Sequence, residues 1–195
     1  SNSLKIFGYG SLCWNPGTGD DILSKTNEGV TTQLGRAVGW RRCWAQKSAD
    51  HRGTPSFLGL VCTLLSDEEV TDITHTTAHN LQSRSKLQAE LQSQAPPQNE
   101  NQLTSSSMTE GLIYTVPPHL VTNCLEQLDF REKGGYSRDV IDVIEDGTNT
   151  IVKALLYRGT PDNPAFSIRA LLDPVYAAGK FCHSLRFDST LFNSI

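Results

Sequence analysis

Cysteines are few and widely separated in this chain, and two signals of secreted proteins are missing. The nearest pair, Cys43 and Cys62, is 19 positions apart, which excludes a CxxC redox motif and a zinc knuckle. No Asn-x-Ser/Thr sequon occurs, and residues 1–10 lack the apolar region of a signal peptide. We therefore expect a cytoplasmic protein with reduced, mostly buried thiols: Cys13, Cys43, Cys62, Cys124 and Cys182.

Long apolar runs and an excess of positive charge are also missing. No stretch approaches 18 consecutive apolar residues, so no transmembrane span is predicted. The balance of 17 Lys and Arg against 21 Asp and Glu gives a net charge of −4, which argues against a nucleic-acid binder and against a polybasic membrane-surface module. A length of 195 residues is typical of one domain.

One internal segment, residues 66–109, contains no glycine, cysteine or aromatic residue and is rich in Ser, Thr, Gln and Asn. It opens with Ser66 and Glu69 in the capping-box pattern of a helix start. The apolar positions that follow form only a thin stripe, which can bury little surface. We therefore predict a single domain over residues 1–195 with a polar surface insertion at about 66–109.

Outside this segment the chain reads as mixed strand and helix. A helix is expected from Pro117 to Lys133, and another from Ser167 to Gly179 that Pro174 disturbs. The strands outnumber the helices and do not alternate with them, so we predict an α+β fold with a mixed, curved or barrel-like β-sheet and flanking helices. Six strands are predicted from short apolar runs: Leu4–Tyr9, Leu34–Trp44 with an interruption, Gly59–Leu64, Leu112–Val116, Arg138–Ile144 and Ile151–Tyr157.

Two glycines, Gly8 and Gly10, follow the first predicted strand. They permit a sharp turn and let backbone N–H groups approach an anion. The run is not a dinucleotide fingerprint, because Cys13 occupies the third glycine position, and it is not a P-loop, because no Gly-Lys-Ser/Thr follows. Spacing alone leaves two interpretations open, a tight turn at a strand end or a cradle for a carboxylate or phosphate.

Glu132 lies where a buried helix face would continue. Steps of four from Leu120 through Cys124 and Leu128 reach this carboxylate, near the negative end of the helix dipole. Burial and the dipole both favour the proton-bound form, which suits a general acid/base working near neutral pH. The alternative is a frayed last turn with Glu132 in water, paired with Arg131 or Lys133.

Three other motifs have simpler interpretations. Asp50 and His51 are adjacent, but without a nucleophile elbow they favour a stabilised turn over a catalytic triad. His75 and His79 are four apart in the polar segment without the HExxH glutamate, so a solvated helix face is favoured over a metal site. The mixture of Trp and Arg at residues 40–44 is weak support for nucleic-acid binding in an acidic chain.

Taken together and in this order, several runs resemble the ChaC family of γ-glutamylcyclotransferases. The most diagnostic run is Leu128–Tyr136, which reads LDFREKGGY. The other runs that carry the resemblance are Ile6–Leu12 with Trp14-Asn15-Pro16, Arg41-Arg42 with Asp50–Pro55, Gly111–Tyr114, and Tyr157 with Asn163-Pro164. The similarity spans about residues 4–166. The polar segment falls between the run at Asp50–Pro55 and the run at Gly111–Tyr114.

The resemblance implies a small α+β domain built around a mixed barrel, and an enzyme that cleaves glutathione to 5-oxoproline and Cys-Gly without a metal or organic cofactor. It implies Glu132 as the catalytic acid/base and a substrate-binding loop made of Ile6, Phe7, Gly8, Tyr9, Gly10 and Ser11. The run at residues 178–187 departs from the family's usual C-terminal pattern, which bears on how the pocket closes at the cysteinyl-glycine side. Two alternatives stay open: a cyclotransferase for other γ-glutamyl amines or amino acids, and a non-catalytic γ-glutamyl-binding module.

Overall fold

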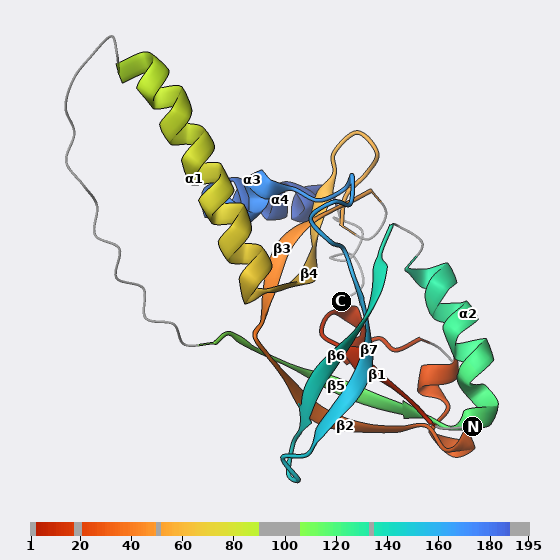
Figure 1. Ribbon diagram of the computed structural model, residues 1–195. Coiled ribbons are helices and arrows are strands. Elements are labelled where there is room, and N and C mark those ends of the chain that lie inside the picture. The colour runs from red at the N-terminus through yellow and green to blue at the C-terminus, as the bar shows by residue number, and fades with distance from the viewer. Residues whose placement is uncertain (1–2, 18–20, 50–51, 90–105, 133–134, 188–195) are drawn as a thin grey trace.

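The computed structural model describes residues 3–17, 21–49, 52–89, 106–132 and 135–187 (Figure 1). Their helices are α1 (Asp67–Ala89), α2 (Val121–Arg131), α3 (Ile168–Leu172) and α4 (Pro174–Phe187), with short 3-10 turns η1 (Ser11–Cys13), η2 (Ile22–Ser24), η3 (Thr26–Glu28) and η4 (Pro118–Leu120). Their strands are β1 (Leu4–Gly8), β2 (Thr31–Val38), β3 (Trp40–Ser48), β4 (Gly59–Ser66), β5 (Met108–Val116), β6 (Ser137–Glu145) and β7 (Ile151–Arg158).

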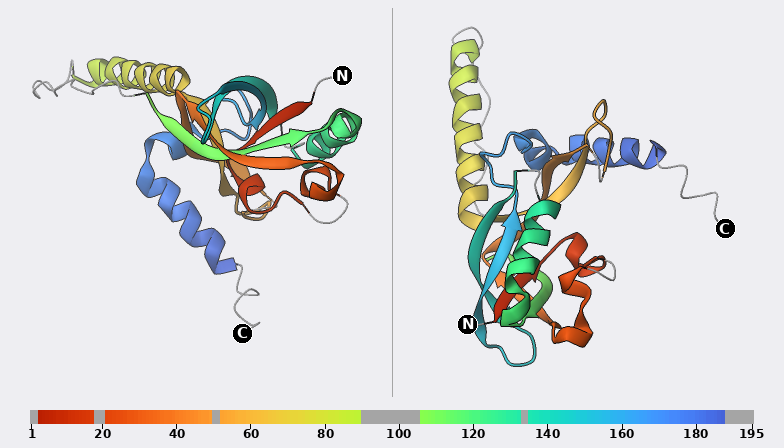
Figure 2. Two further views of the ribbon diagram at one scale, coloured as in Figure 1. Left: turned by 90° about the horizontal axis from the view of Figure 1, so that it is seen from below. Right: turned by 90° about the vertical axis from the view of Figure 1, so that its right-hand side faces the viewer.

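Five of the strands close into a barrel in the order β1-β5-β2-β6-β7. Neighbouring strands pair antiparallel, except that β1 and β7 pair in parallel, with Ile6 opposite Leu155, and so close the barrel. Strands β3 and β4 form a separate two-stranded sheet beside the barrel (Figures 1 and 2). The predicted α+β fold with a mixed, barrel-like sheet is therefore confirmed.

The interruption predicted within Leu34–Trp44 is confirmed, but the range belongs to two strands, because the chain changes sheets there. Strand β2 ends at Val38 in the barrel, and β3 begins at Trp40 in the two-stranded sheet. Between them Gly39 has a φ of 79°, in the left-handed region that favours glycine. One glycine at this corner thus joins two strands that belong to different sheets.

The two helices predicted after residue 116 have different ends from those expected. The region from Pro117 opens with the 3-10 turn η4, and α2 then stops at Arg131 instead of Lys133. The single helix expected over Ser167–Gly179 is two helices, because Asp173 adopts extended backbone and Pro174 begins α4. Proline is favoured in a first helical turn, where its missing N–H costs no hydrogen bond.

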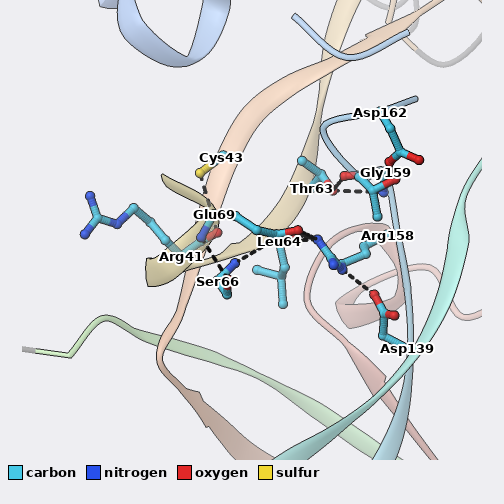
Figure 3. A network of polar contacts seen from close by, with 11 residues as sticks. Arg41, Cys43, Thr63, Leu64, Ser66, Glu69, Asp139, Arg158, Gly159 and Asp162 are labelled. Atoms are coloured by element: carbon cyan, nitrogen blue, oxygen red, sulfur yellow. Dashed lines mark hydrogen bonds and ion pairs between the residues drawn. The ribbon is translucent and has the colours of Figure 1, made fainter. Parts of the chain in front are cut away.

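The first turns of α1 are fastened to the sheets. The predicted capping box is confirmed, since the Ser66 N–H donates to Glu69 Oε2 at 2.8 Å and the Glu69 N–H donates to Ser66 Oγ at 3.1 Å. The other oxygen of Glu69 accepts from Arg158 Nη1 at 3.0 Å, and Arg158 also pairs with Asp139 (Figure 3). Val70 and Ile73 pack against the core beneath β3. The rest of the described helix extends away from the barrel (Figure 1).

The two ends of the polar segment meet. The Ser107 N–H donates to Asp67 Oδ2 at 2.7 Å, and both residues hydrogen-bond Gly39. Ser66 itself belongs to β4, and Met108 and Thr109 belong to β5. The predicted insertion therefore begins at the end of the two-stranded sheet and ends where the chain enters the barrel, beside Gly39, and its boundary residues are part of the strands. No helix in the described part of the chain is long and apolar enough to cross a membrane.

We predict that Glu69→Gln lowers the free energy of unfolding by about 1–3 kcal/mol, the usual contribution of a hydrogen bond to a charged group. The amide still caps the helix but leaves Arg158, whose side chain is only 9% exposed, with Asp139 as its one carboxylate partner. Urea denaturation measures the change. Glu68→Gln, at the exposed neighbouring carboxylate, is the control and should cost less than about 0.5 kcal/mol; equal losses in both variants would contradict the role of Arg158.

We also predict that residues 76–104 can be replaced by about eight glycine and serine residues without loss of cooperative unfolding or of activity. The replacement keeps the turns of α1 that contact Arg158 and that pack, through Val70 and Ile73, against the core beneath β3. Closing a surface loop of either length costs a similar entropy. Loss of the cooperative transition would show that the removed residues contribute to the core.

Candidate active site

The loop after β1 is held in place by the protein on its carbonyl side. The carbonyl of Tyr9 accepts from Arg42 Nε at 3.1 Å, and that of Gly10 accepts from the Cys13 N–H at 2.9 Å. The neighbouring carbonyls are also occupied: Gly8 by Cys13 Sγ at 3.1 Å, Ser11 by the Trp14 N–H at 3.1 Å and Leu12 by Tyr114 Oη at 2.5 Å. In a trans peptide the N–H points opposite to the carbonyl, so the N–H groups of Gly10 and Ser11 point away from the donors that the Tyr9 and Gly10 carbonyls accept from.

The two glycines of this loop meet different surroundings. A Cβ on Gly8 would lie 2.8 Å from Leu12 Cβ, so only glycine fits between the loop and the strand end. A Cβ on Gly10 would meet no atom within 4 Å. Gly10 thus borders open space, as a backbone surface that receives a ligand requires. The binding roles of residues 6–11 stay predictions, and Ile6 and Phe7 themselves are buried in the core.

The C-terminal end of α2 places Glu132 beside this loop. Leu120, Cys124 and Leu128 are buried as expected, and the Glu132 N–H still donates to the Leu128 carbonyl at 2.8 Å. The Glu132 side chain is only 18% exposed, with Oε1 3.4 Å from Arg131 Nε. The carboxylate thus continues the buried face and also has the expected arginine neighbour.

Arg131 joins the two predicted halves of the site, which lie 120 residues apart in the sequence. Its Nη2 donates to Ser11 Oγ at 2.9 Å, while its Nε lies beside the Glu132 carboxylate. The structure thereby brings the loop after β1 and the end of α2 together, as a shared site requires.

Tyr9 lies between these two parts with its side chain 8% exposed. Burial raises the pKa of Tyr9 well above its ordinary value, and the nearby Tyr136, Cys62 and Glu132 raise it further, whereas a hydrogen bond with Thr63 opposes the shift. The phenol therefore keeps its proton at neutral pH. It therefore cannot serve as a base in the site.

Thr63 supports Tyr9 from strand β4. Its hydroxyl donates to the Gly159 carbonyl at 2.8 Å and accepts from the Gly159 N–H at 3.0 Å, and the side chain is fully buried (Figure 3). The phenol of Tyr9 is thus fixed through Thr63 to the end of β7.

The other carboxylates near the end of α2 are occupied by ion pairs. Asp129 accepts from Tyr157 Oη at 2.7 Å and pairs with Arg138, and these bonds lower the pKa of Asp129. Asp139 pairs with Arg158 (Figure 3). Their side chains are 40% and 36% exposed, against 18% for Glu132. Glu132 is therefore the least exposed of the three and the one in range of Tyr9.

Sequence reasoning missed Arg42, Thr63 and Tyr136 as neighbours of the site. Arg42 and Tyr136 stand in runs that carry the family resemblance, but no spacing rule links either of them to Tyr9 or Glu132. Asn163 is similar: its side-chain amide donates to the Gly135 carbonyl at 2.5 Å, next to the end of α2. These contacts depend on strand register, which short motifs do not encode.

The remaining motifs contribute no site in the described residues. His75 and His79 are exposed on α1, as the solvated-face interpretation predicts. Asp50 and His51 lie outside the described residues. Within the described ranges no group of three His, Cys, Asp or Glu side chains could hold a metal ion. The divergent run at 178–187 lies within α4.

The closed mixed barrel is similar to a solved γ-glutamyl cyclotransferase structure. A crystal structure of the yeast γ-glutamyl cyclotransferase specific to glutathione superposes with a TM-score of 0.59 at 26% identity, covering 85% of this chain and 72% of that one. The predicted fold class is confirmed by this likeness.

The family profile described as ChaC-like protein matches residues 4–176, and the chain belongs to this family. It is 30% identical over 168 residues to the glutathione-specific γ-glutamylcyclotransferase 1 of Danio rerio, covering 85% of this chain and 62% of that protein. It is 31% identical over 148 residues to the glutathione-specific γ-glutamylcyclotransferase of Saccharomyces cerevisiae, covering 73% of this chain and 53% of that protein. The chain thus spans between half and two thirds of the length of these relatives.

We predict that Gly10→Val abolishes glutathione binding and leaves the fold intact. The added side chain meets no protein atom near its Cβ and projects into the space where the loop borders solvent. Isothermal titration calorimetry measures the binding, and the thermal midpoint reports the fold. Gly10→Ala, with a smaller projection, should retain part of the affinity. Unchanged affinity in a folded Gly10→Val protein would rule out the loop as the binding surface.

Proposed function

We propose that this protein is a γ-glutamylcyclotransferase that cleaves glutathione to 5-oxoproline and Cys-Gly. The observation that carries the proposal is the half-buried Glu132, joined through Arg131 to the loop after β1 and placed near the proton-bearing phenol of Tyr9. The names of the relatives in zebrafish and yeast support glutathione as the substrate.

The reaction closes a five-membered lactam. The α-amine nitrogen of the γ-glutamyl group attacks its own γ-carbonyl carbon, and the amide bond to cysteine breaks. No water is consumed, because the amine of Cys-Gly leaves as the ring forms. Nucleophile and electrophile are tethered in one molecule, and such geometry can give effective molarities of about 10⁵–10⁸ M.

The protein's task is then proton transfer and orientation. An ammonium cannot attack, and an amide anion is a poor leaving group. The first nitrogen therefore loses two protons on the way from ammonium to lactam N–H, one before the attack and one as the ring forms, and the second nitrogen gains two as Cys-Gly leaves with an ammonium group. Glu132 accepts each proton from the first nitrogen and passes it to the departing amine. The N–H groups of the loop hold the α-carboxylate. The Tyr9 phenol keeps its own proton and does not compete with Glu132 for the proton of the ammonium.

Two further parts of the proposal concern location and substrate range. We place the activity in the cytosol, where glutathione keeps thiols reduced; the described cysteines Cys13, Cys43, Cys62 and Cys124 are all free. A cyclotransferase for other γ-glutamyl amines would turn over γ-glutamyl amino acids as fast as glutathione, and a binding module would release no 5-oxoproline from either.

We predict that Glu132→Gln lowers kcat by about 10²–10⁴-fold, the usual contribution of a general acid/base. The amide keeps the shape and one acceptor oxygen but cannot take the ammonium proton. Glutathione should still bind, because the loop holds its α-carboxylate. Release of 5-oxoproline measures the rate, and calorimetry measures the binding.

Two matched variants of α2 complete this experiment. Glu126→Gln changes an exposed carboxylate on the same helix and should leave the rate unchanged. Asp129→Asn changes a carboxylate held by Arg138 and Tyr157 and should cost less than Glu132→Gln. If Glu132→Gln kept more than about a tenth of the wild-type rate, the proton-transfer role would move to Asp129.

A further inference from the structure

Arg42 is an exposed cation next to the loop, and it pairs with no carboxylate among the described residues. Six other described arginines lie within 4.0 Å of a carboxylate oxygen: Arg36, Arg41, Arg131, Arg138, Arg158 and Arg169. Arg42 instead donates from Nε to the Tyr9 carbonyl at 3.1 Å and from Nη2 to the Glu110 carbonyl at 2.7 Å. Its charge is therefore not neutralised by the part of the chain that the structure describes.

The register of β3 and β4 puts Arg42 on the same face as the core around Tyr9. Arg42 lies directly opposite Leu64, and residues opposite each other in an antiparallel pair share a face. Leu64 packs in one cluster with Phe7 and Tyr9, and Cys62 packs against that cluster. Burial raises the pKa of the Cys13 and Cys62 thiols, and the positive charge of Arg42 opposes this shift at both. The guanidinium thus lies among the groups that surround the loop.

The geometry of the guanidinium leaves one edge unused. The two carbonyls occupy the edge formed by Nε and Nη2. The edge formed by Nη1 and the second hydrogen of Nη2 has two parallel N–H groups, which match the two oxygens of a carboxylate. The main-chain bonds fix the guanidinium in place, so less side-chain entropy is lost when this edge binds an anion.

Glutathione carries a second carboxylate that the loop does not account for. The α-carboxylate of the γ-glutamyl group faces the loop N–H groups, and the glycine carboxylate lies many bonds away at the other end of the peptide. A protein with a net charge of −4 needs a local cation to hold that second anion. We propose that Arg42 binds the glycine carboxylate and is a specificity-determining residue for glutathione. This inference rests on the proposed function.

The test compares glutathione with its glycine ethyl ester, in which a neutral ester with an added ethyl group replaces the second negative charge. In the wild type, kcat/KM for glutathione should exceed that for the ester by about 10- to 100-fold, as expected for a charge-assisted hydrogen-bonded pair. In Arg42→Gln this ratio should fall close to one. If Arg42 only held the Tyr9 carbonyl, Arg42→Gln would lower kcat/KM equally for the two substrates. The ratio would then stay unchanged, which would overturn the inference.

Two further variants complete the test. Arg41→Gln removes the neighbouring cation, which pairs with Asp67 at 3.4 Å, and should leave the ratio at the wild-type value. Arg42→Lys keeps the charge without the fork and should give an intermediate ratio; it also replaces Arg42→Gln if that variant does not fold. A wild-type ratio in a folded Arg42→Lys and Arg42→Gln pair would exclude the contact.

Binding separates failure of this inference from failure of the proposed function. If the wild type released no 5-oxoproline from either substrate, the cyclotransferase proposal would fail. Calorimetry with glutathione and the ester would then still test Arg42, because a preference for glutathione that disappears in Arg42→Gln requires no turnover. Equal affinities for the two ligands in the wild type would overturn the inference in either case.

Discussion

The site depends on the packing of α2 against the barrel. Leu120, Cys124 and Leu128 are buried in one cluster with Ile6 of β1 and Tyr157 of β7. This stripe fixes the rotation of the helix about its axis, and the same four-residue step brings the next position, the carboxylate of Glu132, to the loop after β1. Stability and the placement of the proposed acid/base thus come from one set of contacts, and a helix rotated by one residue would lose both.

Local pattern predicted most of the fold, and it singled out the loop after β1 and Glu132 as candidate site residues, whose roles stay predictions. Apolar runs located the barrel strands because their side chains alternate or are buried on both faces, and the helical stripe located Glu132. The errors lie at junctions. Gly39 ends one strand and begins another within an unbroken β-rich run, and Pro174 starts a helix where a disturbed continuation was expected. Propensity does not tell which sheet a strand joins.

The contacts that sequence could not predict are long-range and polar. Arg158 reaches Glu69 from a strand 89 positions away, and Thr63 bonds Gly159 across 96 positions. A polar side chain in a strand has no periodic signal, since either face of the sheet can hold it. Its partner follows only from the arrangement of strands that are far apart in the sequence. The polar segment shows the same limit: its composition indicated the surface, but not that its first turn neutralises a buried arginine.

An acidic protein that binds an acidic peptide must reserve positive potential for the ligand. Here the carbonyls of the loop after β1 accept hydrogen bonds from internal donors, and the N–H groups of Gly10 and Ser11 point away from those donors. Most described arginines are neutralised by neighbouring carboxylates, whereas Arg42 spends its hydrogen bonds on neutral carbonyls and keeps its full charge. Because those carbonyls belong to Tyr9 and Glu110, the bonds that build the loop also position the uncompensated cation beside it. The position of the loop and the proposed binding of an anion are therefore coupled through Arg42.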